Sequence, residues 1–155
     1  MERWEIEHSI FLSHYKEKMF GTLMGRLDKT ISFTLLLSGS AVFADLGNNK
    51  FFGILVACLS ALSFIGEFGK KSASAIKHSK EYHDLMIKRD NYEDVKSLEK
   101  VFIDLNKNDS IVWNSLSVAA RNRTYLALYG VDKAPTKEKY SVFEALVSWL
   151  AGDKP

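Results

Sequence analysis

The residues of this sequence best suited to bind a charged ligand are Arg121, Arg123 and Tyr125, which lie close together in the chain. Arginine guanidinium groups form paired hydrogen bonds with phosphates, and aromatic rings stack on nucleobases. Lys88 and Arg89 would enlarge this basic surface if the helices that carry them fold together. The sequence therefore predicts a site for a nucleotide or oligonucleotide. An alternative stays open, in which the arginines form surface ion pairs with acidic residues of the preceding helix: Asp90, Glu93 and Asp94.

A second set of polar residues lies within or at the edge of two apolar runs. Thr30, Thr34 and Ser38 recur every four residues and share a helix face, and Glu67 follows the second run. Such a stripe could line a water-filled pore, or its small side chains could let helices pack closely. Glu67 could equally be a surface residue paired with a nearby lysine. Since two helices cannot enclose a channel, a pore would require a homo-oligomer.

The sequence contains no motif typical of an enzyme active site or a metal centre. Its glycines form no phosphate-binding loop, and no serine sits in a nucleophile elbow. The four histidines lack metal-ligand spacing, and Cys58 is the single cysteine. We therefore expect a protein that is not an enzyme and that uses no cofactor and no metal.

Two uncharged apolar runs, residues 30–44 and 51–66, organise the chain around a turn at residues 46–50. As helices they would be about 22–24 Å long, and their flanks bring them near the ~30 Å of a bilayer core. We expect an all-α membrane protein whose residues 30–69 form a two-helix transmembrane hairpin. The alternative is that these runs are the buried core of a soluble helical bundle.

The remaining segments are predicted to be helical and cytosolic. Residues 1–29 form an N-terminal amphipathic helix, residues 70–130 a helical region, and residues 131–155 a linker with a C-terminal amphipathic helix over 137–150. Within the central region we expect a long helix to about residue 106, with a bend or break near Asn91. A further helix over 111–129 would start at Asp109 or Ser110 and stop at Gly130. It is expected to bury apolar side chains that include Ile111 and Trp113.

Charged residues flanking the apolar runs indicate the orientation of the hairpin. Arg26 and Lys29 precede the first run and Lys70 and Lys71 follow the second, whereas the turn carries only Lys50. Because positive residues stay on the cytoplasmic side, both termini are expected to be cytoplasmic and the turn external.

The order of these elements, with the sequence ARNRTYLALYG at residues 120–130, resembles the SLATT proteins over residues 15–130. This family comprises two-transmembrane effectors associated with bacterial nucleotidyltransferase and nucleotide-sensing domains. The resemblance implies an oligomeric, pore-forming effector of antiphage defence in the bacterial inner membrane. It also implies that a nucleotidyltransferase encoded nearby makes the nucleotide or oligonucleotide signal that gates the pore.

Three hypotheses about function follow. The first is the nucleotide-gated, pore-forming membrane effector. The second is a holin-like protein or membrane toxin that needs no ligand. The third is a soluble helical adaptor whose hairpin is its core.

Overall fold

The structure is a computed structural model that describes residues 1–43 and 49–153, and these residues form helices and no strand. The expected all-α fold is confirmed. The described residues contain six α-helices in this order: α1 (Arg3–Phe43), α2 (Asn49–Gly66), α3 (Phe68–Lys88), α4 (Val95–Asn106), α5 (Ser117–Tyr129) and α6 (Val142–Leu150). Two short 3-10 turns, Arg89–Asn91 and Asn114–Leu116, precede α4 and α5.

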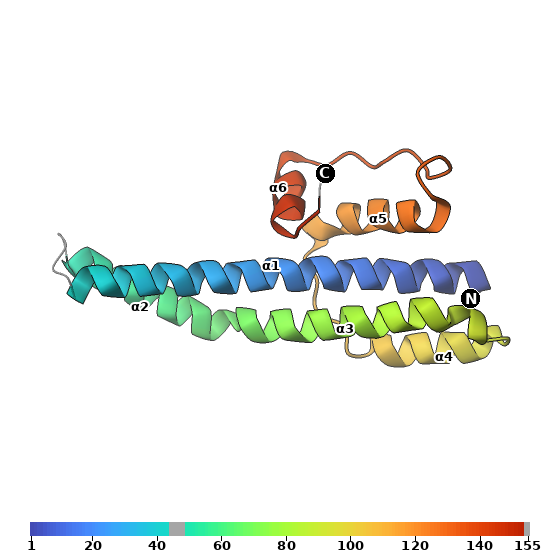
Figure 1. Ribbon diagram of the computed structural model, residues 1–155, viewed down its shortest axis with the longest axis horizontal. Coiled ribbons are helices and arrows are strands. Elements are labelled where there is room, and N and C mark those ends of the chain that lie inside the picture. The colour runs from blue at the N-terminus through green and yellow to red at the C-terminus, as the bar shows by residue number, and fades with distance from the viewer. Residues whose placement is uncertain (44–48, 154–155) are drawn as a thin grey trace.

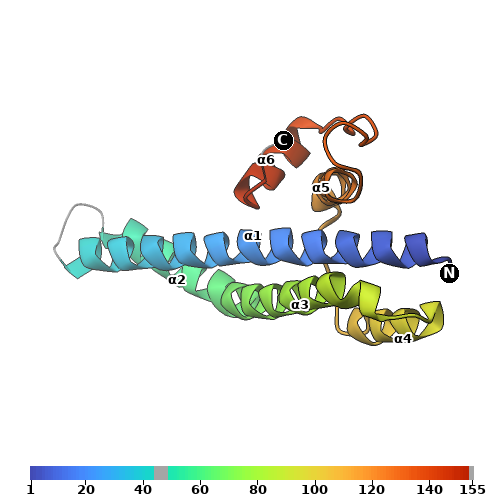
Figure 2. The same ribbon diagram turned by 45° about the vertical axis from the view of Figure 1, so that its right-hand side comes forward.

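Helix α1 is the axis of the molecule. Its 41 residues make a rod about 60 Å long at ~1.5 Å per residue. Figures 1 and 2 show α3 and α4 along one side of its first half, α5 and α6 along the other, and α2 beside its second half. We call residues 30–43 and α2 the arm, and the rest of the described chain the body. The expected boundary between residues 29 and 30 is thus a change of composition inside one unbroken helix.

Small residues let α1 and α3 approach closely. A Cβ atom on Gly21 would lie 2.8 Å from Cγ1 of Ile76, and one on Gly25 would lie 2.8 Å from Oγ of Ser72. The Ser72 hydroxyl donates a 2.7 Å hydrogen bond to the backbone oxygen of Gly21. Larger residues at these glycines would push the helices apart, so this contact fixes the register of the two longest elements of the body.

Two apolar clusters form the core of the body. The first lies where α1 meets α3, α5 and α6 and contains Phe20, Leu23, Met24, Leu116, Ala120 and Val147. The second lies near the start of α1, against α3 and α4, and contains Ile6, Ile10, Tyr82, Leu85, Leu98 and Phe102. The core therefore lies in the body, and residues of the arm take no part in either cluster as far as the chain is described.

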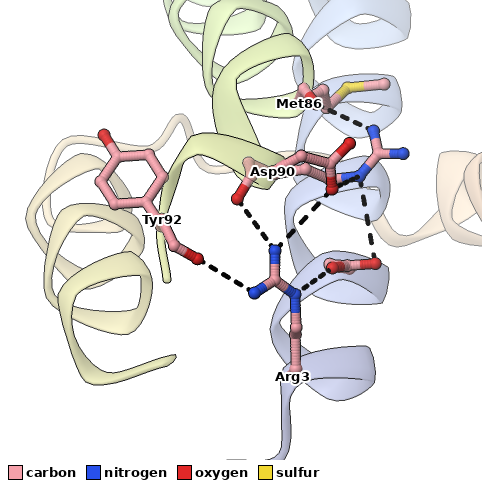
Figure 3. A network of polar contacts seen from close by, with 6 residues as sticks. Arg3, Met86, Asp90 and Tyr92 are labelled. Atoms are coloured by element: carbon pink, nitrogen blue, oxygen red, sulfur yellow. Dashed lines mark hydrogen bonds and ion pairs between the residues drawn. The ribbon is translucent and has the colours of Figure 1, made fainter. Parts of the chain in front are cut away.

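The break predicted near Asn91 is present, and it turns α4 back along α3 (Figure 1). Arg3, in the first turn of α1, holds this corner, as Figure 3 shows. Its guanidinium donates 3.0 Å hydrogen bonds to the backbone oxygens of Arg89 and Tyr92 and lies 3.7 Å from a carboxylate oxygen of Asp90. Asp94 then caps α4 by accepting a hydrogen bond from the backbone N–H of Lys96.

The helix expected over 111–129 begins later, and the prediction that its first residues are buried is wrong. Ile111 is 94% exposed and Trp113 is 45% exposed. The expected caps have other partners: the side chain of Asp109 accepts a 2.7 Å hydrogen bond from the Tyr82 hydroxyl, and the backbone N–H of Ser110 donates to Glu17. These contacts hold the connection extended across the bundle, so that α5 starts only at Ser117.

The stop predicted at Gly130 is confirmed, since Gly130 caps α5 with φ of 74°. The last helix begins at Val142 rather than near residue 137. There, Ser141 and Glu144 form a reciprocal capping box. The preceding residues are held by α5 in an extended form that is described with the site below.

The second helix of the arm is exposed along its length. In the described segment Asn49–Gly66 no residue is buried, and Phe64 is 85% and Ile65 77% exposed. Among the described residues, one helical segment, Asn49–Asn91, is long and apolar enough by its length and composition to cross a membrane. The predicted external turn falls largely on residues 44–48, including Asn48, which lie outside the described residues.

Glu67 breaks the helical path between α2 and α3. Its backbone is left-handed, with φ of 46° and ψ of 36°, a conformation that costs a non-glycine residue about 1–2 kcal/mol. A Cβ atom on the preceding Gly66 would lie 2.3 Å from the Phe68 ring, so the bend requires glycine there. The apolar α2 and the packed α3 are therefore joined by a defined corner.

Glu17 gives the body a pH dependence. It is 1% exposed and accepts a 2.6 Å hydrogen bond from the backbone N–H of Ser110, and burial raises its pKa above 4.5. A raised carboxyl pKa penalises the folded state as pH rises through the interval between the unfolded and folded values. Glu17→Gln is neutral throughout, so its Tm relative to wild type should rise as the pH increases above the ordinary carboxyl value of 4.5. Thermal unfolding followed by circular dichroism measures the Tm at each pH, and Glu93→Gln at an exposed position is the control. The same dependence of Tm on pH for E17Q and wild type would contradict the prediction.

Candidate functional site: a basic pocket between α1, α5 and α6

Helix α5 sends Arg121 and Arg123 to different partners. Residues two apart on an α-helix point in nearly opposite directions, so the pair cannot act as one fork. Arg121 binds Glu138 of the linker, and Arg123 binds Asp153 after α6. The acidic partners considered for these arginines from the sequence were wrong, because both true partners lie in the C-terminal segment.

Arg121 and Asn122 together fix the linker. The Arg121 guanidinium donates to both carboxylate oxygens of Glu138, at 2.7 and 2.6 Å, and this pairing holds the pKa of Glu138 below its ordinary value. Asn122, which is 4% exposed, donates a 3.0 Å hydrogen bond to the backbone oxygen of Glu138 and accepts a 2.9 Å hydrogen bond from its N–H. The Arg121 guanidinium is therefore used to hold the linker in place.

The other residues predicted to bind a ligand lie apart from Arg123. The Tyr125 ring packs against His8, with centroids 5.5 Å apart, and stacks on Tyr129. Arg89 donates a 2.8 Å hydrogen bond to the backbone oxygen of Met86 and lies over the Phe11 ring, near the corner that Arg3 holds. Lys88 is the exposed last residue of α3. The five predicted residues do not form one surface.

A pocket of about 520 Å³ opens where Arg123 reaches across to α1. Its walls come from three elements, α1, α5 and the residues that end α6. Their side chains are Tyr15, Lys18, Met19, Thr22, Arg26, Arg123 and Asp153. The lining brings three positively charged side chains to one cavity.

The pocket already holds one anionic group of the protein. Its three cations, Lys18, Arg26 and Arg123, face the single carboxylate of Asp153, so the lining carries an excess of two positive charges. Asp153 is 5% exposed and binds Arg123 and the Tyr140 hydroxyl. Arg26 donates to the backbone oxygens of Trp149 and Leu150 at 3.1 and 2.8 Å, which satisfies carbonyls at the end of α6. Lys18 makes no side-chain hydrogen bond or ion pair with any described residue.

This arrangement suits an anion with several negative oxygens. Lys18 and the excess charge would attract a phosphate, the Arg123 guanidinium offers directional donors, and Tyr15 supplies a ring at the rim. Burial raises the pKa of the Tyr15 hydroxyl, so it is neutral and able to donate. Sequence reasoning singled out Arg123 here but missed Lys18 and Thr22. The available signal was spacing, since Lys18, Thr22 and Arg26 recur every four residues on one face of α1.

The residues predicted to line a pore differ in exposure. Ser38 is 4% exposed, whereas Thr30 is exposed. Thr34 is half-buried and donates a 2.8 Å hydrogen bond to the backbone oxygen of Thr30. Glu67 lies at the corner below the arm and forms a 3.3 Å ion pair with Lys70, which is the surface pairing considered from the sequence.

Asn122 gives a direct test of how the C-terminal segment is held. Asn122→Ala removes two hydrogen bonds to the backbone of Glu138 and should lower the free energy of unfolding by about 1–3 kcal/mol. It should also make the linker more accessible to trypsin at Lys133 and Lys137. Urea unfolding and limited proteolysis measure both effects, with exposed Asn108→Ala as the matched control. Equal stability and cleavage for N122A and N108A would show that the linker is held in another way.

Comparisons of the whole chain with protein-family models, with curated proteins and with solved structures find no match. Function therefore has to be inferred from the residues and contacts of this chain.

Proposed function

We propose that this protein is an oligomeric, pore-forming membrane effector gated by a nucleotide or oligonucleotide. Residues 30–69 would form a two-helix transmembrane hairpin with both termini in the cytoplasm. The body would stay in the cytosol and carry the ligand pocket. The resemblance to SLATT proteins adds the bacterial inner membrane, antiphage defence and a partner nucleotidyltransferase to this proposal.

The observation that carries the proposal is the exposure of the arm. Eight large apolar side chains of the arm lie open to their surroundings: Phe33, Leu36, Leu37, Phe51, Ile54, Leu62, Phe64 and Ile65. Moving a fully exposed side chain of this kind from water into an apolar medium is worth about 1.5–3 kcal/mol. Because these eight are 49–85% exposed, the set favours lipid by on the order of 10 kcal/mol. Exposed apolar surface of this extent is typical of a membrane or protein contact. The alternative of a soluble adaptor with the hairpin as its core has no support in the packing.

Polar groups of the arm are compatible with lipid. The hydroxyls of Thr34 and Ser40 each donate to a backbone oxygen one turn earlier, at 2.8 and 2.9 Å. Such internal bonds reduce the cost of placing hydroxyls in hydrocarbon. Any conduction path would lie between copies of the chain, with Thr30, Thr34 and Glu67 as its candidate lining. Ser38, which is buried, would act in the packing of the hairpin.

The pocket is the proposed ligand site because it combines phosphate-binding side chains with contacts to α1. Arg26 and Lys18 sit on the same rod that continues into the arm. A ligand could gate the pore only if it binds the open and closed states with different affinity. An anion drawing Arg123 away from Asp153 would change how the end of α6 is held, which supplies such a difference.

Membrane insertion can be tested on the full chain. The wild-type protein should sediment with membranes, resist alkaline extraction and require detergent for release. Leu36→Arg with Leu59→Arg should shift it to the extractable fraction, since each arginine at mid-membrane costs about 2.5–3.5 kcal/mol. Ile103→Arg, at an exposed apolar position of α4, should behave as wild type. A wild-type chain that purifies as a monomer without detergent would overturn the proposal.

Ligand gating can be tested in vesicles loaded with a dye and containing the purified protein. A cyclic dinucleotide and a short oligoadenylate serve as probes, and binding of either should raise or lower the dye flux. Lys18→Glu should weaken the response about tenfold by removing one phosphate partner. Lys96→Glu, the same charge change on α4, should leave it intact. A K18E response equal to that of wild type would remove the pocket from the gating mechanism.

A further inference from the structure

Helix α6 turns an apolar face away from the body. Its packed side carries Val147 and Ser148, which are 5% and 0% exposed. Its outer side carries four apolar residues at helical spacing that are 54–91% exposed in the described structure: Val142, Phe143, Leu146 and Trp149. The linker before this helix and the contacts after it are held by specific hydrogen bonds, so the outward face belongs to a fixed element.

The end of α6 lies at the level of the body where the arm begins. Arg26 holds the backbone oxygens of Trp149 and Leu150, and it lies four residues before Thr30. Across the α1–α3 contact, a Cβ atom on Gly69 would lie 3.2 Å from a carboxylate oxygen of Asp28. The end of α6 is therefore level with the start of α3.

A second exposed apolar set lies at the same level. Ile111 and Trp113 line a cavity of about 490 Å³ together with Phe68 and two lysines, Lys70 and Lys71. The cavity is also lined by Phe20 and Met24 and by the carboxylate of Glu67, so its lining is apolar with one more positive than negative charge. Lys71 makes no side-chain hydrogen bond or ion pair within the described chain. Figure 1 shows that α6 lies across the direction of α1, as a helix on the surface of a membrane would lie if α1 crossed it.

We propose that these two sets form an interfacial belt, Ile111, Trp113, Val142, Phe143, Leu146 and Trp149, that rests in the headgroup region of an anionic bilayer. This inference depends on the proposed membrane insertion of the arm. Tryptophan and other amphipathic residues favour that region, and a helix with one apolar face lies flat in it. Contact of the belt with the headgroups would hold the body at the membrane surface.

Charge at this level selects lipid over a second copy of the chain as the partner. Near the arm the chain carries four basic residues, Arg26, Lys29, Lys70 and Lys71, against two acidic ones, Asp28 and Glu67. Anionic headgroups would be attracted to this excess of positive charge. Symmetric pairing of two copies through the belt would bring the same excess of positive charge together.

The three tryptophans allow the belt to be tested in the full chain. Variants that keep only Trp113, only Trp149 or only Trp4, with phenylalanine at the other two positions, are placed in phosphatidylcholine–phosphatidylglycerol vesicles containing brominated lipids. Trp113 and Trp149 should each lose about half of their emission, as expected at the interface. Trp4 is 60% exposed at the far end of α1 and should be unaffected. Circular dichroism checks that each variant is folded.

A fluorophore on Cys58, which is exposed on α2, separates failure of the belt from failure of insertion. If it reports lipid while Trp113 or Trp149 stays unquenched, the belt is overturned and the membrane proposal stands. If either tryptophan is shielded from both brominated lipid and aqueous acrylamide, a protein contact covers it and the belt is again overturned. If the fluorophore reports water, both proposals fail together.

Discussion

The close contact between α1 and α3 is the constraint on which the rest of this structure depends. Gly21 and Gly25 of α1 leave room for the Ile76 and Ser72 side chains of α3 to pack close to the α1 backbone, and the Ser72 hydroxyl fixes the register of the two helices. This register places Asp28 of α1 beside Gly69 of α3, so the charged residues that flank the two apolar runs lie at a common level. As a result, one end of the helix pair is packed by α4, α5 and α6, and the other end is left as an exposed apolar arm.

The C-terminal segment is attached to this pair by polar contacts as well as by its core. Arg121 and Asn122 hold the linker, and Arg26 and Arg123 hold the residues that end α6. The basic pocket exists only because these contacts bring α1, α5 and the end of α6 together. A ligand of that pocket would therefore act on the attachment of α6 and on the long central helix at once.

Local signals in the sequence predicted much of this fold. The uncharged runs marked the arm, Gly130 marked the end of α5, and the region around Asn91 marked a break. These features depend on composition or on a single residue, so no tertiary information was needed. The pairing of Arg121 with Glu138 could not be predicted in this way, because many acidic residues in the chain were equally suitable partners.

The start of α5 shows why the remaining errors arose. Asp109 and Ser110 are residue types that often cap a helix. Here the Asp109 side chain is bound by Tyr82 and the backbone N–H of Ser110 by Glu17, and the residues that follow are extended. That outcome depends on residues 27 and 93 positions away in the chain. The pocket was only partly predicted for the same reason. Lys18 and Arg26 line a cavity only because the tertiary structure places the end of α6 beside them.

The left-handed backbone of Glu67 has a mechanical consequence. In the described chain, α1 runs from the body into the arm without a joint, whereas its neighbour has a single corner between α2 and α3. A displacement of α1 at the pocket is therefore carried to the distal end as rotation or sliding of a stiff shaft. The companion helix can pivot at its corner, so relative movement in the arm becomes a change in how two rods cross while the body keeps its packing.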